Sequence, residues 1–204
     1  MALFDFFRRR PPISDTGALA DFIDQNAAFL VQKGIYDYAR ARSGPYAKSL
    51  LAQPDFIEAL NRSRWRAYPL GLAMVGEMVE GVLRPYAGEN RSAILDPLST
   101  LVLEVFDRHP VPTTAGSAAW QAARGELVRK LAQISAHPPK LVIDIPEQYA
   151  ERYFNMMPFD KELLSEDVPT TRSYLRLRLI HIRDELVERM DASKLASALR
   201  AYPG

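Results

Sequence analysis

Histidine and cysteine often carry catalysis or hold metals, and this sequence has few of them. It contains no cysteine and three histidines, His109, His137 and His181. The lack of cysteine excludes thiolate zinc sites, cysteine-ligated iron–sulfur clusters and a cysteine nucleophile. The HExxH zinc motif is missing, and no histidine has a glutamate three residues before it, as di-iron helical bundles require. We therefore predict no metal site and no cofactor.

The sequence also lacks the loops that build other common active sites. It has neither the GxxxxGK[ST] nor the GxGxxG pattern of phosphate-binding loops. The GxSxG turn that presents a nucleophilic serine is missing as well. No catalytic residue is predicted, and the sequence favours a protein without catalytic activity.

Cationic and aromatic side chains gather just before Pro69. The members of this cluster are Arg62, Arg64, Trp65, Arg66 and Tyr68. Arginine and aromatic residues are enriched at interaction hot spots, so the cluster indicates an anion-binding or partner-binding patch. The alternative is an exposed arginine face with Trp65 in the core. We take Arg64, Trp65, Arg66 and Tyr68 as binding candidates.

A second cluster combines aromatic residues with methionines. Its members are Tyr149, Arg152, Tyr153, Phe154, Met156, Met157 and Phe159. Such density can line a ligand pocket or a partner groove, and it can equally form part of a core. The candidates for ligand or partner binding are Tyr149, Tyr153, Met156 and Met157.

The first ten residues form an aromatic and cationic segment. Leu3, Phe4 and Phe7 share one helical face, Phe6 lies near its edge, and three arginines follow. Rings of this kind can enter a lipid headgroup region while arginines meet anionic lipid. The candidates for membrane contact are Phe4, Phe6, Phe7, Arg8, Arg9 and Arg10.

This opening resembles the short amphipathic membrane-targeting starts of some bacterial peripheral proteins, such as the cell-division topology factor MinE. The resemblance implies contact with an anionic membrane surface. Ten residues are too few for a stable free helix in water, so a surface or a partner has to induce the helix. Docking to a partner, folding back onto the domain and disorder are the alternatives.

Net charge and hydropathy limit the classes of partner and the cellular locations that we expect for this protein. The chain has 26 basic and 25 acidic residues, without the basic excess typical of nucleic-acid binding. No stretch approaches 18 uninterrupted apolar residues, so no transmembrane helix is predicted. The arginines lead into Pro11 and Pro12 rather than an apolar stretch, which argues against an export signal. We expect a cytoplasmic protein, with the inner face of a membrane as the alternative location.

Helical spacing of apolar residues dominates the rest of the chain. Prolines at 45, 54, 69, 97, 112, 146 and 169 divide it into short segments. Asp96-Pro97 predicts a helix start, and Pro69 predicts either a kink or a new helix. Glycines at 71, 76 and 81 lie in an apolar helical run and indicate close helix packing.

These patterns predict an all-α fold, an irregular multi-helix bundle of about seven to nine helices. Residues 141–145 (LVIDI) are rich in β-branched side chains and form at most one short extended segment. The predicted organisation is a flexible or amphipathic segment over residues 1–12 and a single helical domain over residues 13–204.

The sequence therefore favours a non-catalytic binding or adaptor protein with a protein partner, with peripheral attachment to a membrane through its N-terminus as one option. The alternative is an enzyme or small-ligand-binding protein whose pocket is built from scattered aromatic, methionine and arginine residues. Function depends on the geometry of a site rather than on the fold, so a helical protein can carry such a pocket without a linear signature.

Overall fold

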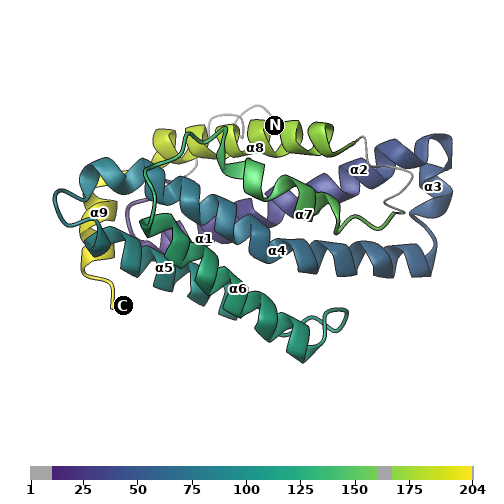
Figure 1. The fold of residues 1–204 in the computed structure, drawn as a ribbon, viewed down its shortest axis with the longest axis horizontal. Helices are drawn as coiled ribbons and strands as arrows, with labels where there is room; N and C mark the ends of the chain where they lie inside the picture. The colour runs from purple at the N-terminus through teal and green to yellow at the C-terminus, as the bar shows by residue number, and fades with distance from the viewer. Residues whose placement is uncertain (1–10, 160–166, 204) are drawn as a thin grey trace, which may run out of the picture.

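The computed structural model describes residues 11–159 and 167–203, and within these ranges the chain is a bundle of α-helices (Figure 1). The helices are α1 (Thr16–Ala28), α2 (Gly34–Ser43), α3 (Ala47–Leu50), α4 (Pro54–Leu83), α5 (Ser92–Asp107), α6 (Ser117–Ser135), α7 (Ala150–Phe154), α8 (Val168–Arg189) and α9 (Ala192–Arg200). The prediction of an all-α, irregular multi-helix bundle is confirmed.

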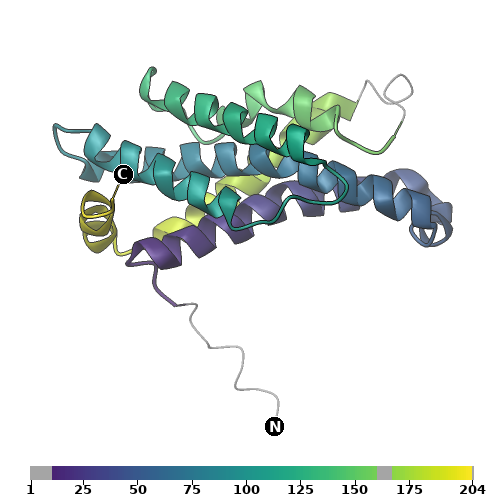
Figure 2. The ribbon, with the colours of Figure 1, turned by 90° about the horizontal axis from the view of Figure 1, so that it is seen from below.

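Helix α4 is the central element of the bundle. It contacts α1, α5, α6 and α8, which surround it in both views (Figures 1 and 2). Residues 67–80 are all buried, because neighbouring helices cover this stretch, which is apolar apart from Glu77 and Glu80. Pro69 lies inside this single helix, so the structure decides against a new helix at that proline.

Side-chain caps and glycines set several helix ends. The Asp15 carboxylate accepts a 2.8 Å hydrogen bond from the Ala18 amide and caps α1. Gly44 ends α2 with a φ of 50°, in the left-handed region that favours glycine. Asp191 caps α9 by accepting from the Lys194 amide.

The helix start predicted at Asp96-Pro97 is wrong by about one turn. Helix α5 begins at Ser92 and contains Pro97 in its interior. Ile94 and Leu95 are both buried. Tertiary packing of these two side chains extends the helix upstream of its local start signal.

The segment at residues 141–145 forms a turn rather than an extended strand. The Asp144 amide donates a 2.8 Å hydrogen bond to the Leu141 carbonyl, and a 3-10 helix follows at Ile145–Gln148. Among the described residues, strand-like pairing is confined to a parallel bridge between Ile13 and Met190. That bridge joins the described start of the chain to the C-terminal end of α8.

A π-helical turn interrupts the regular helices between α1 and α2. Residues Phe29–Lys33 form a π-helix between α1 and α2, here called the π-turn.

Within the described ranges, no helix combines the length and the apolar character needed to cross a bilayer.

Candidate functional site

The structure separates the first predicted cluster. Tyr68 is buried, and its hydroxyl donates a 2.6 Å hydrogen bond to Asp24. Burial raises the pKa of Tyr68, and the hydrogen bond to Asp24 adds to this effect. The Trp65 ring packs edge-on against Tyr68, His109 and Trp120. Trp65 and Tyr68 therefore belong to an aromatic layer of the interior.

The arginines of that cluster point to different places. Arg64 donates a 2.8 Å hydrogen bond to Gln32 of the π-turn. Arg66 is exposed and lies near Glu126 and Arg152 on another face of α4. The candidates Arg64, Arg66 and Tyr68 thus do not share one surface.

The second predicted cluster lies in the core. Tyr149 and Tyr153 are fully buried, while Met156 and Met157 are each 8% exposed. The Tyr153 hydroxyl donates a 2.7 Å hydrogen bond to the Val31 carbonyl in the π-turn. Burial raises the pKa of Tyr153 well above its usual value. These side chains pack α7 against the rest of the bundle.

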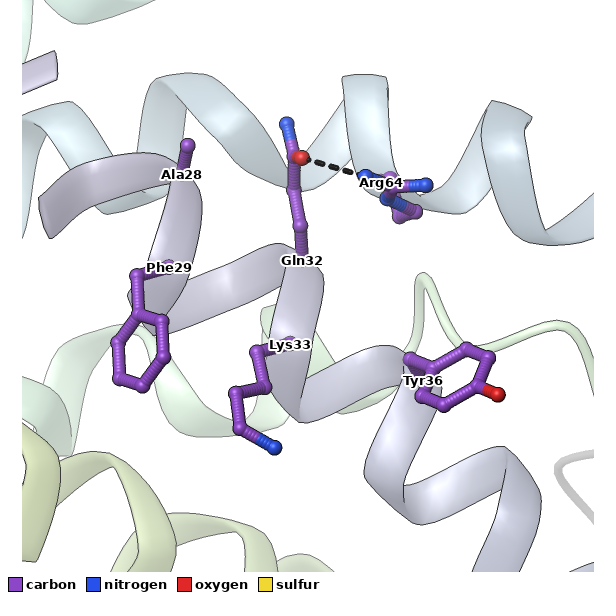
Figure 3. A pocket seen from close by; sticks show the side chains of 6 residues that line it. All are labelled: Ala28, Phe29, Gln32, Lys33, Tyr36 and Arg64. Carbon is purple, nitrogen blue, oxygen red and sulfur yellow. Dashed lines mark hydrogen bonds between the residues drawn. The ribbon is translucent and has the colours of Figure 1, made fainter. Parts of the chain in front are cut away.

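A shallow pocket of about 350 Å³ lies over the π-turn (Figure 3). Gln32 points toward Arg64 of α4, whereas Phe29 and Lys33 extend to the other side. The polar groups are paired locally, because Arg64 binds Gln32 and the Lys33 ammonium contacts the Asp37 carboxylate at 2.7 Å. The pocket therefore offers an incoming ligand few unsatisfied groups.

Two buried carboxylates on α4 were not singled out by the sequence. Glu77 accepts from Lys140 at 2.8 Å and from Gln148 at 3.2 Å, which holds residues 139–148 against α4. The Glu80 carboxylate accepts hydrogen bonds from Arg84 and Arg91 near the C-terminal end of α4. The available signal was a pair of acidic residues inside an apolar, glycine-containing run.

The segment held by Glu77 forms one wall of an apolar groove of about 570 Å³, here called the α8 groove. Met78 and Val82 of α4 form part of its floor, Leu141 and Ile143 line one wall, and Ile180 and Val187 of α8 line the other. Leu141 is 71% exposed and Val187 is 50% exposed. Exposed aliphatic side chains that stand singly are common, whereas apolar side chains grouped on one surface mark interaction sites, so this groove is the best candidate site.

Charged side chains lie both at the floor of the α8 groove and along its α8 wall. At its floor the Glu77 carboxylate and the Lys140 ammonium neutralise each other. Asp184 follows Ile180 by four residues and precedes Val187 by three, so it lies beside both on α8. Arg183 also lines the groove and contacts Asp184 at 2.7 Å.

A second hollow, here called the Pro11 hollow, lies on the far side of α8. Its lining residues are Pro11, Pro12, His181, Asp184, Glu185, Glu188 and Arg189. Its volume is about 970 Å³. The Arg189 guanidinium binds Glu185 and donates a 3.2 Å hydrogen bond to the Pro11 carbonyl. Carboxylates outnumber arginines here, so the hollow is acidic.

The candidates for membrane contact, Phe4, Phe6, Phe7, Arg8, Arg9 and Arg10, lie outside the described residues. Over the described ranges, no group of three or more potential ligand side chains is placed to hold a metal ion. Comparisons with protein-family models, with curated proteins and with solved structures gave no significant match.

Proposed function

We propose that this is a non-catalytic binding protein that receives an amphipathic, cationic segment of a partner protein in the α8 groove. The observation that carries this proposal is the groove itself, an apolar cavity bordered by exposed aliphatic side chains. Its walls are two helices and a turn held in place by buried hydrogen bonds, so the surface is formed before any ligand arrives.

The groove suits the binding of an amphipathic helix. Such helices lay an apolar face into a groove and anchor it with side chains spaced three and four residues apart. Covering the exposed parts of Leu141, Ile143 and Val187 contributes about 3 kcal/mol of hydrophobic free energy. A dissociation constant of about 10 µM needs about 7 kcal/mol net. Burial of the partner's own apolar face and contacts of its cations therefore have to supply the rest and offset the loss of freedom on binding.

The carboxylates on α8 favour a partner segment whose polar face is cationic. Asp184 and Glu188 are exposed on α8 beside Val187. Asp184 is paired with Arg183 and Glu77 in the floor with Lys140, so Glu188 adds the negative charge on this side of the groove. A segment with arginine or lysine next to its apolar face would place these cations over Asp184 and Glu188. An acidic segment would be repelled there.

The alternative of a pocket built from the aromatic and methionine clusters has less support. Tyr68, Tyr149 and Tyr153 are buried and hydrogen-bonded to protein groups, so they serve packing. Their hydroxyls are directed into the molecule rather than toward a ligand.

The proposal can be tested with a fluorescein-labelled peptide of leucine, phenylalanine and arginine, written with one apolar and one cationic helical face. We expect the full chain to bind this peptide with a dissociation constant of about 10 µM, as measured by fluorescence anisotropy. Val187→Asp should weaken binding about tenfold, because it removes apolar area and places a charge in the groove.

The matched control is Ile57→Asp, which changes a half-exposed aliphatic residue near the start of α4. It should leave the affinity for the peptide unchanged, and a peptide of scrambled order should bind more weakly. Equal affinity of wild type and Val187→Asp for the ordered peptide would overturn the proposal.

A further inference from the structure

We propose that the chain's own N-terminal segment, residues 3–10, occupies the α8 groove and shields it from partners. This inference rests on the proposed function, because it assigns a regulator to the same groove. The aromatic and cationic residues 3–10 would then contact the apolar side chains of the α8 groove.

The place where the chain joins the bundle supports this assignment. The Ile13 amide donates to the Arg189 carbonyl, and the Asp191 amide donates to the Ile13 carbonyl, both at 3.0 Å. Ile13 thereby bridges Met190, which lines the α8 groove, and Pro11 is held by Arg189. Residues 1–10 are therefore tethered at the end of α8 that borders both hollows.

Opposite charges favour contact between the arginines of the segment and the Pro11 hollow. Arg8, Arg9 and Arg10 directly precede Pro11, which lines the acidic Pro11 hollow. The carboxylates of Asp184 and Glu188 lie in that hollow and are exposed. Arginines next to these two groups gain charge-assisted contacts.

The apolar residues then reach the groove on the other side of α8. Leu3, Phe4 and Phe7 share one helical face, and the groove presents Ile180 and Val187 on its α8 wall. Helix α8 with its side chains is about 10–12 Å across. Leu3 precedes Pro11 by eight residues, which span about 12 Å as a helix and at most about 28 Å when extended, so the segment can cross α8 in a partly extended form.

Tethering explains why such a short segment can bind. A free helix of this length is marginal in water, so it needs a surface that buries its apolar face. Attachment at Pro11 keeps the segment at a high effective concentration near the groove. An external partner must therefore displace it, which makes the groove selective for stronger or more concentrated ligands.

Photo-crosslinking in the full chain tests this docking directly. Phe7→p-benzoyl-phenylalanine should, under ultraviolet light, link residue 7 to residues 139–145 or 180–190, as read by mass spectrometry of the digest. In a mixture of ¹⁴N- and ¹⁵N-labelled chains the links should join segments of the same isotope. Val187→Asp should reduce the yield of this link, and Ile57→Asp should not.

Links to another chain, links to a different surface, or a yield insensitive to Val187→Asp would each overturn the inference. Binding of the chain to phosphatidylglycerol vesicles tests the alternative that residues 1–10 contact a membrane. If the chain shows no link in buffer and binds the vesicles only with Phe4 and Phe7 intact, residues 1–10 belong to a membrane instead.

The peptide assay separates this inference from the proposed function. Replacing the anchors by Phe4→Ser and Phe7→Ser should tighten binding of the amphipathic peptide about tenfold if the segment occupies the groove about 90% of the time. No tightening, with Val187→Asp still weakening the peptide, would overturn the inference and leave the proposed function standing. A link from residue 7 without peptide binding in any variant would overturn the proposed function, and with it the shielding of the groove from partners.

Discussion

At the scale of single residues, the π-turn depends on one tyrosine and one glycine. The Tyr153 hydroxyl satisfies the Val31 carbonyl inside the π-turn. A side chain at Gly34 would collide with Tyr153, since a Cβ there would lie 2.5 Å from its hydroxyl oxygen. The π-turn therefore coincides with a close approach of α7 to the junction of α1 and α2.

Tyr153→Phe should lower the free energy of unfolding by about 1 kcal/mol, because it removes a buried hydrogen bond and leaves the Val31 carbonyl with the Gly34 amide as its donor. Urea denaturation followed by circular dichroism measures this change. Tyr46→Phe, at an exposed position, should have little effect on stability. Equal stability of both variants would show that the π-turn does not need this hydrogen bond.

At the scale of elements, the glycines of α4 differ in role. A Cβ on Gly71 would lie 2.6 Å from the Ala27 carbonyl oxygen, so this glycine lets α1 and α4 approach closely. A Cβ on Gly76 would meet Val102 at 3.3 Å. Gly81 faces open space and lines the α8 groove. Packing accounts for Gly71 and Gly76, and it does not account for Gly81.

Gly71→Ala and Gly81→Ala should therefore change stability in opposite directions. Gly71→Ala should lower the free energy of unfolding by about 1–3 kcal/mol, since backbone atoms must move apart. Gly81→Ala should raise it by up to about 1 kcal/mol, because alanine favours the helix and meets no neighbour. A shared sign in urea denaturation would contradict this account of α1 packing against α4.

At the scale of the whole molecule, the described start of the chain is tied to its distant C-terminal part. Ile13 is fully buried and bridges Met190, although most of the sequence separates them. Arg200 donates to the Tyr86 carbonyl and Tyr202 donates to Glu104, so the C-terminal helix is fastened to the middle of the chain. These links close one end of the bundle.

Ile13→Ala should lower the free energy of unfolding by about 2–4 kcal/mol, the usual result of removing a buried isoleucine side chain. Ile57→Ala is the comparison, because that side chain is 41% exposed and should contribute much less. Thermal and urea denaturation of the full chain measure both values. If Ile13→Ala proves as mild as Ile57→Ala, the predicted boundary of the folded domain at residue 13 is wrong.

The all-α class was predictable because it follows from local patterns. Apolar spacing, caps such as Asp15 and prolines such as Pro54 act over a few residues and can be read along the chain. Clusters along the sequence do not correspond to single surfaces of the structure. Arg64, Arg66 and Tyr68 are neighbours along one helix, yet a helix turns successive side chains to different directions, so they face different surroundings.

The sequence by itself determined that the described part of this protein is helical, where many of its helices end, and that an aromatic and cationic stretch precedes Pro11. Only the tertiary structure showed the α8 groove, because its lining comes from residues 77–86, 139–145 and 180–190. Exposure of Leu141 and Val187 likewise depends on which helices cover them. Burial is a property of the packed molecule, and no local pattern reports which apolar side chains packing leaves uncovered.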